Sequence, residues 1–292
     1  MLRGVALVVC AACAWGTWSL FLRPTGLPAA WTAAIVASLV ALLTIPLFGR
    51  DPAPRWDRRT LMLLGVFAVL DAVNVGTFFA AMSATSVAIA VLTHSFAPIL
   101  VALAAPFVER QRVPGAPVAA AVALGGIVLL VRPWEGVRGD VLMGAALGSA
   151  SAFAYAGNVF LTRHLTPRLG AARTMGLHSA GSALLLIPFA IVTPAEVEIA
   201  DLGLLALGAA LLGVGGNVAF ANGIVRIGSA RAAVLAFLEP LVACVVGWAA
   251  FGEELGPLSA LGGALILGAG VLVARAEPEP VAAVASEPVV TG

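Results

Sequence analysis

Ten apolar runs, separated by short polar segments, dominate the hydrophobic pattern of this chain. Each run is close to the roughly 20 residues that an α-helix needs to cross the hydrocarbon core of a bilayer. The connecting segments are too short to hold a soluble domain. The pattern therefore predicts an all-α integral membrane protein with ten transmembrane helices, at roughly residues 4–22, 29–48, 61–82, 87–108, 114–131, 140–162, 172–193, 202–223, 230–251 and 257–274.

The composition supports this interpretation, because 61% of the 292 residues are hydrophobic and only 11% are charged. Soluble domains do not have such a composition, so we expect the lipid bilayer to be the main partner of the chain. The net charge of +1 gives no reason to expect a nucleic acid partner. Cys10, Cys13 and Cys244 all lie in apolar runs and form no disulfide framework, and we expect no metal or cofactor.

Arginines are distributed unevenly between the two sets of loops. If the N-terminus is cytoplasmic, only Arg23, Arg132 and Arg138 of the chain's 16 basic residues fall on the outer side. Positively charged loops remain on the cytoplasmic side during membrane insertion. The distribution predicts a multi-pass protein of the cell inner membrane with both termini in the cytoplasm. The Pro- and Glu-containing tail, residues 276–292, is expected to be disordered there.

The second half of the chain repeats features of the first half. The pattern S-x-x-x-A-V-L begins at Ser86 and again at Ser229, and a proline follows each copy. We therefore predict two repeats of five helices, in residues 1–132 and 139–275. Because five is an odd number, the second repeat must be inverted relative to the first. Inverted repeats are typical of secondary transporters, whose binding site lies near the midplane between the halves.

The strongest single candidate for function is Glu239, an acid near the middle of the ninth apolar run, followed directly by Pro240. A carboxylate at membrane depth is costly and usually faces a cavity or the interior of the bundle. Proline lacks an N–H, so we expect the carbonyl of Ala236 to lose its helical partner. His94 and Pro98 hold similar places in the fourth run. Pro98 and Pro240 are thus candidate hinges.

Other polar residues inside the apolar runs are candidates for the same site. Asp71 and Asn74 are three residues apart and share one helix face. Trp15 and Trp18 are candidate pocket walls, with the interfacial aromatic belt as the alternative. Amides and histidines, including His178, can also serve only to pack helices together. The candidates for a substrate or proton pathway are Asp71, Asn74, His94, Tyr155, Asn158, Asn217, Asn222 and Glu239.

Several of these residues carry a resemblance to a known family. Leu238-Glu239-Pro240, followed by Gly247-Trp248 and Gly252-Glu253, resembles the ninth-helix signature of the EamA-type drug/metabolite transporters. Trp15-Gly16 is similar to the opening motif of that family. Many repeats of the family carry Glu before the proline of the fourth helix, where this chain has Ala97. The resemblance implies two inverted EamA repeats and a small-solute carrier, usually an exporter of amino acids or related metabolites.

The sequence thus favours a secondary-active carrier that works by alternating access. Its energy would come from the gradient of the solute or from protons, with Asp71, His94 or Glu239 as proton carriers. An uncoupled facilitator is an alternative, and in that case neutralising Asp71 and Glu239 would leave net flux unchanged. An intramembrane enzyme or a receptor-like protein is less favoured, because the polar residues form no recognisable catalytic set. Monomer and homodimer both remain open.

Overall fold

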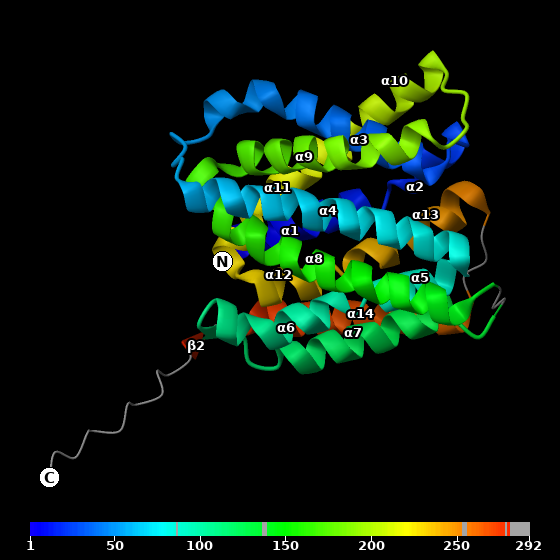
Figure 1. Ribbon diagram of the computed structural model, residues 1–292. Helices are drawn as coiled ribbons and strands as arrows, with labels where there is room; N and C mark the ends of the chain where they lie inside the picture. Colours follow the sequence, from blue (N-terminus) through cyan, green and yellow to red (C-terminus); the bar gives the residue numbers. More distant parts are fainter. Residues whose placement is uncertain (86, 136–138, 253–255, 278, 281–292) are drawn as a thin grey trace, which may run out of the picture.

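The computed structural model describes residues 1–85, 87–135, 139–252, 256–277 and 279–280, and it consists almost entirely of helices (Figure 1). Five helical segments make up the first half, and three of them are divided into shorter elements. They are α1 (Leu2–Trp15) with α2 (Ser19–Leu22) and η1 (Arg23–Thr25), α3 (Ala29–Thr44) with η2 (Ile45–Arg50), α4 (Arg58–Ala84), α5 (Val87–His94) with α6 (Ala97–Val108), and α7 (Ala116–Val131).

Five helical segments also make up the second half. They are α8 (Val141–Leu169), α9 (Ala171–Ile191), α10 (Ile199–Gly208) with the π-helix η3 (Ala209–Gly216) and α11 (Asn217–Ile227), α12 (Ser229–Leu235) with α13 (Leu238–Phe251), and α14 (Pro257–Arg275). Two short strands, β1 (Gln111–Arg112) and β2 (Glu279–Pro280), pair antiparallel at one end. Among the described residues, eight spans are long and apolar enough to cross a membrane. The prediction of an all-α, ten-helix membrane fold is confirmed.

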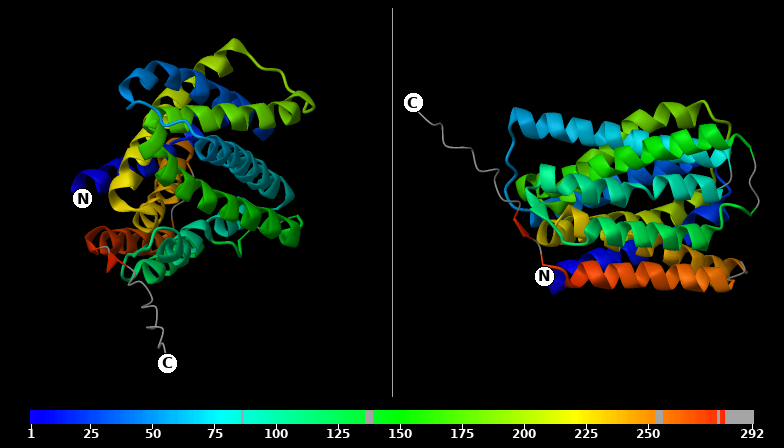
Figure 2. Two further views of the ribbon diagram at one scale, coloured as in Figure 1. Left: turned by 60° about the vertical axis from the view of Figure 1, so that its left-hand side comes forward. Right: turned by 90° about the horizontal axis from the view of Figure 1, so that it is seen from below.

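The packing of the helices follows the internal repeat. Equivalent helices of the two halves pack on each other, α3 on α9, α7 on α14 and α6 on α12. The contact of α4 with α8 has its counterpart in the contact of α11 with α1. We call the first contact the α4–α8 seam and the second the α1–α11 seam; both join one half of the chain to the other. The N-terminus and strand β2 lie at the same end of the bundle, as an even number of crossings requires (Figures 1 and 2).

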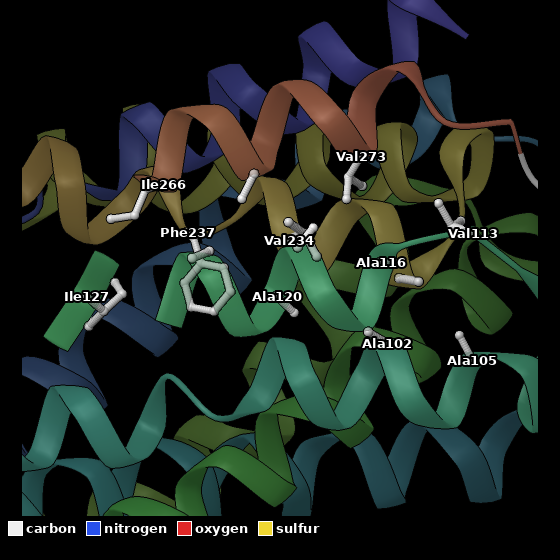
Figure 3. Packing of buried hydrophobic residues seen from close by; sticks show 14 of the residues in the cluster. Ala102, Ala105, Val113, Ala116, Ala120, Ile127, Val234, Phe237, Ile266 and Val273 are labelled. Atoms are coloured by element: carbon white, nitrogen blue, oxygen red, sulfur yellow. The ribbon is translucent and has the colours of Figure 1, made fainter. Parts of the chain in front are cut away.

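Small residues let the helices approach closely, as is common in membrane bundles. A Cβ on Gly126 of α7 would lie 2.6 Å from the carbonyl oxygen of Gly262 on α14. The same Cβ would lie 2.9 Å from Ile266 Cγ1. Figure 3 shows Ile266 of α14 with Ile127 of α7 and the ring of Phe237 in one apolar cluster. Dispersion contacts between closely packed side chains therefore hold this pair of helices together.

Two helices, one in each half, are broken at similar places. The chain turns at Ser95–Phe96 between α5 and α6, and at Ala236–Phe237 between α12 and α13. Pro98 and Pro240 follow these turns, within the first turn of the next helix, where a missing N–H costs no hydrogen bond. Pro240 cannot donate to the Ala236 carbonyl, as expected, and this carbonyl instead accepts the N–H of Glu239 at 2.9 Å.

Two side-chain contacts, at opposite ends of the bundle, join helices of different halves. At the end that holds the N-terminus and strand β2, Arg163 of α8 forms an ion pair with Glu109, which follows α6. At the other end, the guanidinium of Arg23 lies 4.5 Å from the centroid of the Phe251 ring, beyond α2. We call these contacts the Arg163 clasp and the Arg23 clasp. The predicted features at Arg138, at Glu253 and in the tail from residue 281 lie outside the described residues.

Candidate functional site

A row of hydrogen-bonded polar side chains runs along the α4–α8 seam. The Asn158 Nδ2 atom donates to Asp71 Oδ1 at 3.4 Å, and the Ser151 hydroxyl donates to Asn74 Oδ1 at 2.8 Å. Asp71 and Asn74 are neighbours on α4, while Ser151 and Asn158 are two turns apart on α8. We call these four residues the polar ladder. Because its two sides belong to different halves of the chain, the ladder lies at the boundary between the repeats.

His94 lies at one end of the polar ladder. Its Nδ1 atom is 2.9 Å from the Ser151 hydroxyl oxygen. The imidazole ring packs between Phe78 of α4, with the centroids 4.8 Å apart, and Tyr155 of α8, at 5.3 Å. His94 is the last residue of α5, directly before the helix break. The break thus brings an imidazole from a third helix to the α4–α8 seam.

His178 of α9 lies at the other end of the ladder. Its Nε2 atom is 3.9 Å from Asp71 Oδ2, and its Nδ1 atom is 3.0 Å from the Thr174 carbonyl oxygen. The imidazole stacks on the ring of Phe67, with the centroids 3.9 Å apart and the planes nearly parallel. Only 5% of His178 is exposed. The sequence favoured this histidine less than His94, yet it lies beside the acid of the ladder.

Glu239 lies in the first turn of α13, directly after the break between α12 and α13. Helix N-termini favour negative charge, which explains how a carboxylate is accommodated there. Within the described part of the chain, this carboxylate has no hydrogen bond and no ion pair. It is near enough to Tyr155 for direct electrostatic interaction. Tyr155 thus interacts both with Glu239 and with His94 at the end of the polar ladder.

The remaining candidates lie on α11, at the end of α1 and at the start of α2. The Asn222 amide donates to the Val218 carbonyl oxygen on its own helix at 2.9 Å, and Asn217 begins α11 directly after η3. Neither has a hydrogen bond to a described residue of the polar ladder. Trp15 packs against Phe220, at 5.1 Å between ring centroids, and against Gly216. Trp18 packs against Gly208, so both indoles lie against glycines in or beside η3.

Ser151 is the ladder residue that sequence reasoning missed. A signal was present, because Ser151, Tyr155 and Asn158 are spaced by four and three residues and so share one face of α8. A serine in a helix rich in Ala, Gly and Ser attracts little attention by itself. Gly144 and Gly148, on the same helix, pack against Thr85 and Thr93.

An apolar hollow and the acidic, histidine and cysteine side chains offer no better site. A hollow of about 260 Å³ between α3, α9 and α10 is lined by apolar side chains and Ser38, with no charged group to orient a polar solute. In the described part of the chain, no three His, Cys, Asp or Glu side chains gather closely enough to hold a metal ion. The polar ladder with its two histidines, Tyr155 and Glu239 is therefore the best candidate site.

Comparison with known proteins agrees with this architecture. A family model described as the EamA-like transporter family matches twice, over residues 2–132 and 142–275. An uncharacterised transporter from Archaeoglobus fulgidus is 31% identical over 278 residues, covering 95% of this chain and 98% of the relative. A protein of known crystal structure shares the fold with a TM-score of 0.79 at 19% identity, covering 93% of this chain and 98% of that one. The chain therefore belongs to the EamA-like transporter family and is a multi-pass membrane transporter rather than an enzyme.

Proposed function

We propose that this transporter is a secondary-active carrier that exports amino acids or related small metabolites across the cell inner membrane. The observation that carries this proposal is the polar ladder, which lies in an apolar bundle at the boundary between the two repeats. Buried polar groups in a membrane bundle are costly and typically mark the path of a solute. Carriers with repeated halves bind their solutes at this boundary.

The solute would bind beside Tyr155, between the polar ladder and Glu239. The Glu239 carboxylate has no partner among the described residues, so it is available to an ammonium group of the solute. The amide of Asn74 and the hydroxyl of Ser151 offer polar contacts at the other end of this site. An amine and a polar group on one small molecule match this arrangement, which supports amino acids and similar metabolites as cargo.

Alternating access would arise from movement of one repeat, residues 1–132, against the other, residues 139–275. The Arg163 clasp and the Arg23 clasp lie at opposite ends of the bundle and join different halves, so each can close one side of the path. The breaks before Pro98 and Pro240 would absorb the change in angle. The end with the Arg163 clasp also holds most of the arginines, which supports its placement, with both termini, in the cytoplasm.

The test compares metabolites inside and outside cells that overproduce the wild type, Glu239→Gln or Glu135→Gln at matched membrane levels. Glu135 is a control acid, paired with Arg132 at the surface. We expect one amino acid or related solute to leave wild-type and Glu135→Gln cells about tenfold or more faster than Glu239→Gln cells, as expected when a buried charge–charge contact is lost. If all three proteins export the solute equally, Glu239 is not in the site. If no solute leaves any of the cells, the exporter proposal is wrong.

A further inference from the structure

We infer that Asp71 and His178 together form a proton-binding site that couples solute transport to the proton gradient. This inference rests on the proposed carrier function and names its driving ion. It assigns the coupling step to one pair of residues and separates this pair from Glu239 and from His94. The hydrogen-bond donors and acceptors around this pair restrict where protons can be.

The tautomer of His178 follows from its surroundings. The Nδ1 atom lies 3.0 Å from the carbonyl oxygen of Thr174, and a carbonyl oxygen can only accept a hydrogen bond. Nδ1 must therefore carry a hydrogen. In a neutral imidazole only one nitrogen is protonated, so Nε2 then presents a lone pair. That lone pair is directed to Asp71 Oδ2, 3.9 Å away, and a carboxylate oxygen is also an acceptor.

The site is thus short of one hydrogen. Asp71 Oδ2 and His178 Nε2 face each other as two acceptors, and the buried Asn158 Oδ1 atom has no hydrogen-bond partner in the described part of the chain. Asn158 Nδ2 supplies a donor only to the other carboxylate oxygen of Asp71. Buried acceptors without donors are unfavourable. One added proton would turn one of the two facing acceptors into a donor. The pair could then form a charge-assisted hydrogen bond, which is strong and requires a separation shorter than 3.9 Å.

Binding of this proton is linked to the relative position of the two halves. Asp71 lies on α4 of the first half, whereas His178 lies on α9 and Asn158 on α8 of the second half. A hydrogen bond between Asp71 and His178 requires these atoms to approach by about 1 Å. The stacked ring of Phe67 can accept the positive charge of an imidazolium on its face. Protonation therefore favours a closer approach of α4 to α9, and deprotonation releases it.

The chemical step is a simple proton transfer. An O–H bond of a hydronium ion breaks, an N–H bond forms at His178 Nε2, and the pair changes from a net charge of −1 to zero. When the site opens to the opposite side, the N–H bond breaks and water takes the proton. No bond of the solute changes.

Other titratable groups lie further along the helices packed on α4 and α9. The sequences of α3 and η3 contain none. The groups on the remaining neighbours are Arg50 of η2, His94 of α5, Tyr155, Arg163, His164 and Arg168 of α8, and Arg226 of α11. No ion pair or hydrogen bond joins any of them to Asp71 or His178 among the described residues.

His94 differs from His178 in one decisive respect. Its Nδ1 atom faces the hydroxyl of Ser151, which can donate or accept a hydrogen bond. The single hydrogen of that hydroxyl is donated to Asn74, so the Nδ1–H of a neutral His94 donates to the Ser151 oxygen and the contact is satisfied without an added proton. This contrast is why the proton site is assigned to His178 and Asp71.

The experiment uses the full chain in liposomes with a pH difference of one unit. The probe solute is a ¹³C-labelled mixture of the protein amino acids, followed by mass spectrometry, and an internal pH-sensitive dye reports proton movement. One pH unit can sustain an accumulation ratio of about tenfold if one proton moves per solute. We expect this ratio, with proton movement, for the wild type and for the control His164→Gln, whose histidine is exposed. Asp71→Asn and His178→Gln should reach a ratio near one and, as purified proteins, take up fewer protons than the wild type on a step from pH 8 to pH 5.5.

The outcomes separate the inference from the proposed function. If Asp71→Asn and His178→Gln accumulate solute tenfold like the wild type, the proton site is wrong while the carrier stands. If the wild type moves no labelled solute, the amino acid carrier is wrong. Proton uptake by the purified proteins on a step from pH 8 to pH 5.5 then decides the site, and equal uptake by wild type and both variants overturns it. If Asp71→Asn does not fold, Asp71→Glu must keep the tenfold ratio that His178→Gln loses, and equal ratios overturn the inference.

Discussion

The α4–α8 seam and the α1–α11 seam occupy equivalent places in the two repeats, yet they are built in opposite ways. The first is held together by hydrogen bonds of the polar ladder, such as that between Ser151 and Asn74. The second is closed by glycines and apolar side chains. A Cβ on Gly223 would lie 2.6 Å from Val8 Cγ2 and 3.0 Å from the carbonyl oxygen of Gly4. Backbone symmetry is thus combined with chemical asymmetry.

The difference between the two seams indicates where a polar solute can pass. Polar side chains can exchange their hydrogen bonds with one another, with water or with a solute at little net cost. A contact between two backbones leaves no room for any of these molecules. We therefore expect the α1–α11 seam to stay closed and act as the pivot between the two repeats, while the α4–α8 seam opens and closes. Four variants, each with its own control or second condition, test this contrast.

Loss of the Arg163 clasp, which joins α8 to the residue after α6, should have the largest effect. Glu109 and Arg163 are 10% and 23% exposed at the side chain, and Glu109 Oε2 also lies 3.4 Å from the Ser229 backbone nitrogen. Glu109→Gln leaves the arginine charge without its partner, so the free energy of unfolding in detergent should fall by about 3–5 kcal/mol.

The matched control is Glu279→Gln at the same end of the bundle. Glu279 pairs with Arg112, but these side chains are 49% and 63% exposed. An exposed ion pair contributes less than about 1 kcal/mol, so this variant should unfold almost like the wild type. Equal losses for the two variants would show that the clasp is not a buried ion pair.

The α1–α11 seam is tested with Gly223→Leu. The new side chain would push Val8 and the backbone at Gly4 apart, and overpacking of this kind costs about 1–3 kcal/mol. We expect a clear fall in the unfolding midpoint. Gly203→Leu is the control, because no atom lies within 4 Å of a Cβ placed there. If Gly223→Leu is as stable as this control, the seam is not closed by glycine.

The polar ladder itself is tested with Ser151→Ala. Ser151 is fully buried and lies within hydrogen-bonding distance of both Asn74 and His94, so its loss leaves buried groups unpaired. Unfolding should require about 1–2 kcal/mol less free energy. Ser182 is equally buried, but its hydroxyl has no partner among the described residues. Ser182→Ala should therefore be neutral or slightly stabilising, and the reverse order of stabilities would contradict a hydrogen-bonded ladder.

The smallest effect concerns the start of α4, where Asp57 forms an ion pair with Arg168 of α8. The N–H of Thr60 donates to the carboxylate at 2.6 Å, and this hydrogen bond, with Arg168 adding to it, lowers the pKa of Asp57. A lowered pKa in the folded state adds stability above the unfolded value of about 3.9, and this stability is lost as the pH falls through the folded value. The wild type should thus unfold at a slightly higher temperature than Asp57→Asn at pH 7, and this difference should shrink as the pH falls to 3 and below. An equal difference between the two unfolding midpoints at both pH values would show that the ionised Asp57 carboxylate is not the source of the added stability.

The sequence alone was sufficient to predict the fold and part of the candidate site. Bilayer thickness dictates the length of each apolar run, and a repeated pattern such as that at Ser86 and Ser229 needs no coordinates to be recognised. Asp71 and Asn74 could be placed on one face because both lie on the same helix, where spacing determines direction. These properties are local, so a linear sequence contains them.

Which polar side chains contact one another depends on how the helices pack. The rotation of each helix about its own axis depends on packing against several neighbours, and spacing along one helix does not reveal it. For this reason His178 was underrated and Ser151 was missed, although both contact ladder residues of α4. For the same reason Asn222, which looked equivalent to Asn158, turned out to bond its own helix. The sequence determined ten helices and their polar residues; the packing of one helix on another determined which residues face one another.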